Sequence, residues 1–274
     1  RVQYFFFLLA SVVILLIKRK QRRAIAAGAF ALINLSLIIP FYIGSPTVYA
    51  AGRTHRALLF NVNTINQSHK EVGAFIHSQR PDFMVLVEVG RTLGSALQKT
   101  RGAYPFSASV LREDGFGIAL ISRIPFENAE IVSIGEREVP SVIARFEIDG
   151  QPLTVIGIHA HSPVSQTHWR YRNSELADLT QVASSQKGHV MILGDLNTTS
   201  WSPFFRDLLR KTGLRDSRNG FGVQPTWPTV FPPLWIPIDH CLLSSGVVVH
   251  NRRIESSIGS DHYPVVVDFS VEPL

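Results

Sequence analysis

Val190-Met-Ile-Leu193, followed by Gly194-Asp195-Leu196-Asn197, is the stretch of this 274-residue chain that decides the fold. Four consecutive apolar residues predict a buried strand, and Gly, Asp and Asn are residues that favour turns. A carboxylate beside a buried apolar strand is costly unless a metal ion or hydrogen bonds compensate it. The stretch therefore predicts either a strand that ends in a polar pocket or an ordinary turn.

The same pattern, a polar side chain at the end of an apolar run, recurs along the chain. The other examples are Asn61 after residues 58–60, Glu88 after 84–87, His159 after 155–158, Asp239 after 236–238, and Asp261 with His262 before 263–267. Each of these residues alone also fits an ordinary role as a turn residue, a cap or a core residue. Together they predict that several strand ends converge on one polar pocket.

Short β-branched runs and helical spacing alternate through most of the chain. Strands are predicted at 57–62, 83–87, 118–121, 131–134, 142–148, 153–158, 190–193, 238–243 and 265–269, and helices at 68–79, 92–100, 165–185 and 202–213. Because helices follow some strands and hairpin turns follow others, we predict an α/β fold. Its two β-sheets pack face to face with helices outside them, as a four-layer α/β sandwich.

The N-terminal part has a different composition. Residues 2–17 and 24–43 are two apolar runs, separated by Lys18-Arg-Lys-Gln-Arg-Arg23. A bilayer core takes about 20 helical residues; the second run reaches this length, and a missing piece upstream of Arg1 would explain why the first falls short. The basic loop should stay in the cytoplasm. We predict a membrane anchor of two transmembrane helices at residues 1–52, with a cleaved signal peptide as the alternative.

The location of charge also separates the two parts of the chain. Of the 27 Lys and Arg residues, six lie in residues 1–52, which leaves 21 against the 21 Asp and Glu residues. Residues 53–274, the predicted catalytic domain, are thus formally neutral, and the charge gives no support for a surface that coats DNA. The single cysteine, Cys241, excludes an intramolecular disulfide and a cysteine-based zinc site.

The polar motifs, in their order along the chain, resemble the endonuclease/exonuclease/phosphatase superfamily. They are Phe60-Asn61-Val62, Val87-Glu88-Val89, Gly117-Ile-Ala-Leu-Ile-Ser-Arg123, Gly157-Ile-His159, Gly194-Asp-Leu-Asn197, Ile238-Asp-His240 and Ser260-Asp-His262-Tyr-Pro264. This superfamily includes DNase I-like nucleases, abasic-site endonucleases, inositol polyphosphate phosphatases and neutral sphingomyelinases. The resemblance covers about residues 56–271, and Pro225-Thr-Trp-Pro228 is similar to a membrane-anchored bacterial subgroup.

The resemblance implies a divalent metal site. Mg²⁺ prefers carboxylate oxygen and keeps several of its waters, and Glu88 is the residue best suited to bind it. Asn61 and Asp261 are expected to hold or orient the same ion. Mn²⁺ is a plausible substitute for Mg²⁺, and the number of ions is left open.

The resemblance also implies catalytic roles for five residues. Asp195 would orient or deprotonate the attacking water, and Asn197 would bind a phosphate oxygen. His262, oriented by Asp239, would contact the phosphate or transfer a proton. His159 would protonate the leaving group or stabilise the transition state, although His161, two residues on, points the same way along a strand. Gly115-Phe-Gly117 lacks the spacing and the Lys of a phosphate-binding loop, so we interpret these glycines as the start of a strand.

The sequence therefore predicts a metal-dependent phosphoester hydrolase, acting as a phosphodiesterase, a nuclease or a phosphatase. The catalytic domain is expected on the periplasmic or extracellular side of the cell membrane. The substrate class stays open among lipid headgroups, nucleic acids and nucleotides, and no obligatory protein partner is evident. The alternative is a catalytically silent membrane protein that binds a headgroup or a protein on the same fold. The 219–237 stretch, rich in Gly, Pro and aromatics, predicts a long ordered loop that either seals the core or contacts lipid.

Overall fold

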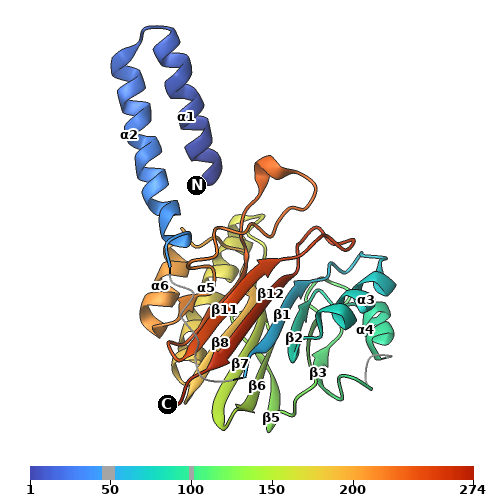
Figure 1. Ribbon diagram of the computed structural model, residues 1–274. Helices are drawn as coiled ribbons and strands as arrows, with labels where there is room; N and C mark the ends of the chain where they lie inside the picture. Colours follow the sequence, from blue (N-terminus) through green and yellow to red (C-terminus); the bar gives the residue numbers. More distant parts are fainter. Residues whose placement is uncertain (45–52, 99–101) are drawn as a thin grey trace.

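A computed structural model describes residues 1–44, 53–98 and 102–274 of the chain (Figure 1). Two six-stranded mixed sheets form the body of the protein. The first sheet has the order β11 (Val247–Ile254), β12 (Val265–Val271), β1 (His55–Asn61), β2 (Phe83–Val87), β4 (Ile118–Ser122) and β3 (Phe106–Val110). The second has the order β5 (Asn128–Ser133), β6 (Pro140–Ile148), β7 (Gln151–His159), β8 (His189–Asp195), β10 (Asp239–Leu243) and β9 (Arg215–Asp216).

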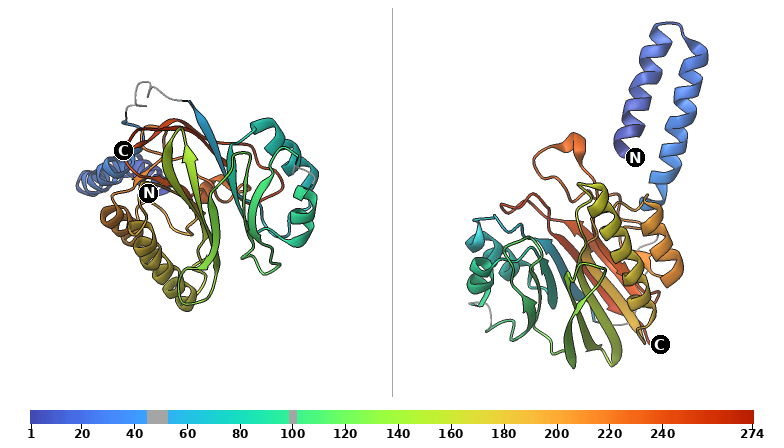
Figure 2. Two further views of the ribbon diagram at one scale, coloured as in Figure 1. Left: turned by 90° about the horizontal axis from the view of Figure 1, so that it is seen from below. Right: turned by 180° about the vertical axis from the view of Figure 1, so that it is seen from behind.

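Each sheet buries one face against the other sheet and its opposite face against helices (Figure 2). In β1, Leu59 belongs to the core between the sheets, whereas Leu58 and Phe60 face α3 (His69–Gln79) and α4 (Arg91–Leu97). The second sheet is covered by α5 (Gln166–Ser184) and α6 (Pro203–Thr212). The helix–sheet–sheet–helix order confirms the predicted arrangement of two packed sheets flanked by helices.

Two parallel strand pairs bring the ends of four strands to one edge of the sandwich. β1 runs parallel to β2 with Asn61 beside Val87, and β7 runs parallel to β8 with His159 beside Asp195. The helices α3 and α5 make the two crossover connections that such pairs require. β10 then pairs antiparallel with β8, so its first residue, Asp239, also lies beside Asp195.

Three strands were absent from the prediction. β3 and β11 are the edges of the first sheet and β9 is an edge of the second, so each has a neighbour on one side only. Their sequences are correspondingly polar: β11 contains His250, Asn251, Arg252 and Arg253, and only part of it is buried. The strands predicted at 238–243 and 265–269 are found as β10 and β12, and β11 between them was missed. The predicted end of a helix at Thr100 lies outside the described residues.

The N-terminal residues form a helical hairpin that extends away from the sandwich (Figure 1). Its helices are α1 (Val2–Ile17) and α2 (Gln21–Ile38), the latter continued by a short 3₁₀ turn, η1 (Ile39–Phe41). Among the described residues one helix, Gln21–Phe41, is long and apolar enough to cross a membrane, with a mean hydropathy of 2.1, and α1 is shorter. One candidate span is found where two were predicted. Membrane insertion and orientation stay predictions, and the predicted boundary after residue 52 lies outside the described residues.

The end of the hairpin that includes Phe41 rests on the sandwich. The indole Nε1 of Trp201 donates to the carbonyl of Leu37 at 3.0 Å, and Phe41 packs with Ile38, Val223 and Trp201. The carbonyl of Phe41 accepts hydrogen bonds from two backbone amides of the loop that begins at residue 219. The hairpin is therefore docked on the domain through a small apolar cluster.

Candidate active site

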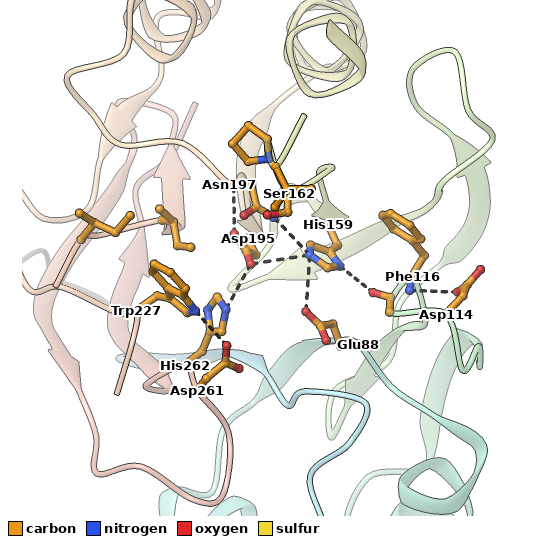
Figure 3. Close-up of a pocket in the computed structure, with 15 residues that line it drawn as sticks. Glu88, Asp114, Phe116, His159, Ser162, Asp195, Asn197, Trp227, Asp261 and His262 are labelled. Carbon is orange, nitrogen blue, oxygen red and sulfur yellow. Dashed lines mark hydrogen bonds and ion pairs between the residues drawn. The ribbon is translucent and has the colours of Figure 1, made fainter. Parts of the chain in front are cut away.

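The predicted site residues line a pocket of about 480 Å³ at the edge where the parallel strands end (Figure 3). The residues at its wall come from both sheets and from the loops between their strands. They are Glu88, Asp114, Gly115, Phe116, His159, Ser162, Pro163, Val164, Asp195, Asn197, Trp227, Ile236, Ile238, Asp261 and His262. Two further predicted residues, Asn61 and Asp239, lie directly behind this wall and contact it by hydrogen bonds.

Four side chains from four different segments meet at the centre of the pocket. His159 Nε2 lies 3.8 Å from Glu88 Oε1 and 3.7 Å from Asp195 Oδ2. On the other side, His262 Nε2 lies 3.7 Å from the same oxygen of Asp195. These separations are too long for tight ion pairs among the four groups, so their charged atoms remain directed at the pocket.

Asn61 lies beneath this cluster and is fully buried. Its Nδ2 donates to Glu88 Oε1 at 2.8 Å and to Asp195 Oδ2 at 3.1 Å, and its oxygen accepts from the backbone amide of Asn63. In this arrangement Asn61 fixes the positions of two carboxylates and presents no oxygen to the pocket. Its direct role as a metal ligand stays a prediction.

Glu88 has the environment that a hard divalent cation requires. Its side chain keeps 22 % of its surface exposed, toward the pocket. Its backbone has a φ of 60°, a left-handed conformation that costs roughly 1–2 kcal/mol for a residue with a Cβ. Such strain persists where the surroundings fix it, often at functional sites. The turn it makes after β2 aims the carboxylate into the pocket.

Asp261 is the second carboxylate that suits a cation. It lines the pocket from the segment before β12. Its Oδ1 accepts from Asn63 Nδ2 at 2.6 Å and its Oδ2 from the indole of Trp227 at 2.9 Å. Neutral donors hold the carboxylate without cancelling its charge. Two oxygen donors of this kind fit Mg²⁺, which binds through one or two carboxylates and keeps its other waters.

His262 and Asp239 form a tightly hydrogen-bonded pair. His262 Nδ1 lies 2.8 Å from Asp239 Oδ2, and both side chains are buried. Burial opposes the protonated ring, but the charges of Asp239 and Asp195 overcome it and raise the pKa of His262 to about 10. His262 is therefore a cation near neutral pH, with Nε2 toward the pocket.

The pKa of Asp195 is raised as well, but here the shift favours the neutral form of the group. Burial, aided by the charge of Asp239, raises the pKa of the Asp195 carboxyl to about 6. A carboxylate with a pKa close to neutral accepts a proton from water more readily than an ordinary aspartate. The environment thus favours a general base at this position.

Asp195, Asp239 and His262 each offer one donor atom within 4.8 Å of the others, a spacing that also suits a metal ion. The hydrogen bond between His262 Nδ1 and Asp239 and the raised pKa of His262 argue against this arrangement, because a metal-bound imidazole must be neutral. These two observations favour proton transfer and phosphate contact for the trio, and the binding of a cation by Glu88 and Asp261 stays a prediction.

The two candidate histidines have separate environments. His159 Nδ1 lies 2.9 Å from the carbonyl of Gly115, which leaves Nε2 directed into the pocket. His161 is buried outside the pocket wall, where it forms a short contact with Glu175 of α5 and packs against Phe116. The geometry favours His159, because it alone of the two faces the other site residues.

Asn197 and Gly115 complete the wall around His159. Asn197 Nδ2 donates to the carbonyl of Ala160 at 2.9 Å and lies 3.4 Å from His159 Nε2. Its backbone amide donates to Asp195 Oδ1, with a φ of 46° that an Asn tolerates. Gly115, interpreted from the sequence as the start of a strand, instead lies in the turn before β4 and orients a catalytic candidate through its carbonyl.

Sequence reasoning missed several residues that hold this site in place. Asn63 and Trp227 bind the two oxygens of Asp261. The hydroxyl of Ser260 donates to the carbonyl of Asn61 and accepts from the amide of His262, which ties the two segments together. Ser260 in Ser-Asp-His and Trp227 in Pro-Thr-Trp-Pro were visible signals, whereas Asn63 lies in a loop without a distinctive pattern.

The model of the Endonuclease/Exonuclease/phosphatase family matches residues 58–262 of the chain. The chain belongs to this family. A UPF0294 protein of Vibrio parahaemolyticus is 29 % identical over 127 residues, which cover 45 % of the chain and 42 % of that relative. The matched region thus spans less than half of the curated relative.

Solved structures share the fold of this Endonuclease/Exonuclease/phosphatase family member. A Bacteroides vulgatus protein described as an endonuclease/exonuclease/phosphatase is 19 % identical, with a TM-score of 0.68 over 80 % of this chain and 100 % of that chain. TDP2 of D. rerio, solved with a single-strand DNA product, is 18 % identical, with a TM-score of 0.68 over 80 % and 99 %. The human Nocturnin catalytic domain, solved with sulfate, is 16 % identical, with a TM-score of 0.66 over 80 % and 95 %. The fold is therefore that of the family, and it supports phosphoester hydrolysis at this coarse level.

Proposed function

We propose that the protein is a Mg²⁺-dependent hydrolase of phosphate esters, with phosphodiesters as its preferred class. The single observation that carries this proposal is that Glu88, His159, Asp195 and His262 meet at one pocket. His159 lies 3.8 Å from Glu88, and both histidines lie 3.7 Å from Asp195. The four residues come from distant positions in the sequence and supply a metal ligand, a base and two imidazoles. This set matches the needs of phosphoester hydrolysis, namely an activated water, neutralised phosphate oxygens and an acid for the leaving group.

Glu88 and Asp261 would hold the divalent cation, with Asn61 orienting Glu88. When bound, such a cation neutralises charge on the phosphoryl oxygens and orients the substrate. His262 presents its protonated Nε2 beside the same space and would stabilise the charge that develops on phosphate oxygen. Asp239 fixes the ring of His262 through Nδ1 and maintains its charge.

Asp195 would accept the proton of the attacking water, which its raised pKa favours. Asn61 and the backbone amide of Asn197 fix the two oxygens of this carboxylate through separate hydrogen bonds. His159 keeps one proton on Nδ1, which donates to the carbonyl of Gly115, and the doubly protonated ring would give its second proton from Nε2 to the leaving oxygen. Asn197 would contact a phosphate oxygen after turning its amide from Ala160.

The site is proposed to act on the exported face of the cell membrane, anchored by the α1–α2 hairpin. The apolar Gln21–Phe41 helix and the basic turn at residues 18–23 support this placement. The alternative is a silent protein that only binds a headgroup or a protein. The perturbed pKa values of Asp195 and His262 count against it, because displaced pKa values at a cleft are typical of catalytic groups.

The test is turnover by the full chain, purified in detergent, on a panel of phosphate esters. Bis-p-nitrophenyl phosphate, p-nitrophenyl phosphate, single-stranded DNA and a phospholipid would be assayed with Mg²⁺, with Mn²⁺ and after chelation by EDTA. We expect hydrolysis of at least the activated diester, its loss in EDTA and its return with Mg²⁺. A folded protein that hydrolyses none of these compounds with either metal would contradict the proposal.

A further inference from the structure

A second depression lies beside the active-site pocket, between the N-terminal hairpin and the loop at residues 226–237. This groove has a volume of about 830 Å³. One wall is the start of α1 and the other is the short 3₁₀ turn η3 (Pro232–Leu234) with the residues around it. Its lining is mostly apolar and aromatic: Arg1, Gln3, Tyr4, Thr199, Trp201, Ser202, Trp227, Pro233, Leu234 and Ile236.

The groove and the active-site pocket share two wall residues, Trp227 and Ile236. These residues pair with each other through backbone hydrogen bonds of 2.7 Å and 3.1 Å, which form a rigid divider. Trp227 combines both characters, because its indole nitrogen donates to Asp261 in the pocket while its ring also lines the groove. A polar reaction site and an apolar groove are therefore adjacent, with one side chain serving both.

The protein leaves apolar side chains uncovered around this divider. Leu234 is 54 % exposed, Phe231 52 % and Val230 84 %, and all three belong to the same loop. Val164, on the wall of the active-site pocket, is 78 % exposed. Figure 1 shows this loop, in orange, projecting toward the beginning of α1. Exposed apolar groups gathered at a binding site, rather than scattered singly, mark a surface that contacts an apolar ligand or a membrane.

We propose that the groove binds the hydrocarbon tail of an amphiphilic phosphate ester while its phosphate occupies the active-site pocket. This inference rests on the proposed hydrolase function and names its substrate class, a membrane lipid or lipid-linked phosphate. The occupant follows from the walls of the groove. One is the apolar helix α1, which is continuous with the candidate membrane anchor, and the other is a loop rich in Pro and Trp.

A free nucleotide or a nucleic acid has no apolar chain that would fill this groove. Such ligands are polyanions along their length, and the only basic side chain in the groove lining is Arg1. The domain from residue 53 onward is also formally neutral. An acyl or prenyl chain, in contrast, gains free energy for each methylene that it buries.

Two chromogenic diesters that differ only in their tail test the proposal. Methyl p-nitrophenyl phosphate and hexadecyl p-nitrophenyl phosphate release the same leaving group, and both would be assayed with the full chain in mixed micelles. We expect kcat/KM for the hexadecyl ester to be at least about tenfold higher, because burial of only two methylenes suffices for that factor. Leu234→Arg and Tyr4→Ala, one from each wall, should reduce this preference by about fivefold to tenfold and leave the methyl ester unchanged.

Ile131→Arg is the matched control, because Ile131 is 43 % exposed on the edge strand β5 and does not line either depression. It should keep the wild-type ratio between the two esters. Equal hydrolysis of both esters by the wild-type chain would overturn the groove assignment, as would an unchanged ratio in Leu234→Arg. Failure to hydrolyse either ester would instead overturn the proposed function, and the tail site with it.

Discussion

Asp239 and His240 are consecutive residues of β10, yet they belong to two buried charged clusters with different surroundings. Successive side chains of a strand point to opposite faces of its sheet. Asp239 therefore faces His262 and the pocket, whereas His240 faces α6 and packs on Phe205 with ring centroids 4.4 Å apart. The two clusters allow a direct comparison of what buried charge does when it borders a pocket and when it does not.

The cluster around His240 is closed. The Arg218 guanidinium is fully buried and forms an ion pair with Asp216, and His240 Nε2 binds the carbonyl of Thr198 at 2.7 Å. Although burial opposes ionisation, the charge of Arg218 holds the pKa of Asp216 well below its usual range. Burial and the same guanidinium lower the pKa of His240 to about 3. Here the charged groups satisfy one another and stabilise the fold beneath the hairpin.

The cluster around Asp239 is open on one side. His262 and Asp195 both direct an atom at the pocket, and the pKa values of both are raised. The shift favours a protonated imidazole at His262 and a more basic carboxylate at Asp195. Both clusters consist of buried side chains, and they differ in that only the cluster around Asp239 borders a pocket. We infer that the open cluster serves catalysis and the closed one stability, and the variants below separate the two roles.

The largest expected effect is on catalysis. His262→Ala removes the protonated imidazole that Asp239 orients. We expect kcat to fall by about 10²–10⁴-fold, the contribution typical of a positioned acid or base. The thermal midpoint should also fall, because Asp239 is left buried without its partner, so kcat is measured well below that midpoint. His161→Ala is the matched control, because His161 also pairs with a carboxylate but lies outside the pocket. A similar loss of kcat in both variants would contradict the distinction between open and closed sites.

The next effect is on stability. Arg218→Met leaves Asp216 buried without its partner, so the free energy of unfolding should fall by about 3–5 kcal/mol. Arg145→Met, which breaks the exposed pair with Glu130, should cost less than about 1 kcal/mol. Chemical denaturation followed by tryptophan fluorescence measures both. The remaining folded Arg218→Met protein should turn over at a rate within a few fold of the wild type, and a complete loss of activity would argue that this cluster also takes part in catalysis.

A smaller effect is expected at the support of the metal site. Trp227→Phe keeps the aromatic ring and removes the hydrogen bond to Asp261. Because residues that orient metal ligands typically contribute about 10–100-fold to affinity, the Mg²⁺ concentration for half-maximal rate should rise by that factor. Trp201→Phe, which removes an indole hydrogen bond to the hairpin instead, is the control. An unchanged Mg²⁺ dependence in Trp227→Phe would remove Asp261 from the metal site.

The closed cluster also predicts how stability depends on pH. His240 remains neutral in the folded protein down to about pH 3, whereas the unfolded chain binds a proton near the usual pKa of 6.5. The unfolded state therefore holds more protons between these values, so the free energy of unfolding falls as the pH falls. The expected slope from this residue is about 1.4 kcal/mol per pH unit. His240→Gln should show a shallower decline between pH 6 and pH 4 in urea unfolding, and an equally steep one would contradict the assignment.

The sequence predicted most of the fold because both faces of the central strands are buried and their apolar runs are unambiguous. The edge strands β3, β9 and β11 were missed, since a strand with one neighbour needs no such run. The site could be located because Glu88, His159 and Asp195 each end a buried strand. Only the structure distinguishes His159 from His161. β7 ends at His159, which lines the pocket, whereas His161 lies beyond the strand and contacts Glu175 of α5.

Other features of the site had no local signal. The groove is lined by Tyr4 and Leu234, which are far apart in the sequence, and periodicity carries no information about such an arrangement. The orientation of Asn61, with its nitrogen toward Glu88, is set by Asn63 and Asp195 from the surrounding loops and strands. The sequence therefore predicted the residues of the site and the pairing of His262 with Asp239, but not the partners of Asn61 or Asp261.

The central claim, that Glu88 holds the cation for phosphoester hydrolysis, is tested most directly by kcat/KM for bis-p-nitrophenyl phosphate. The wild-type chain and Glu88→Gln, which keeps the shape and removes the charge, would be compared at the same saturating Mg²⁺ concentration. We predict a loss on the order of 10²–10³-fold, as for other groups that stabilise transition-state charge, with no change in the unfolding midpoint. A Glu88→Gln protein that retains a rate near that of the wild type would contradict the account.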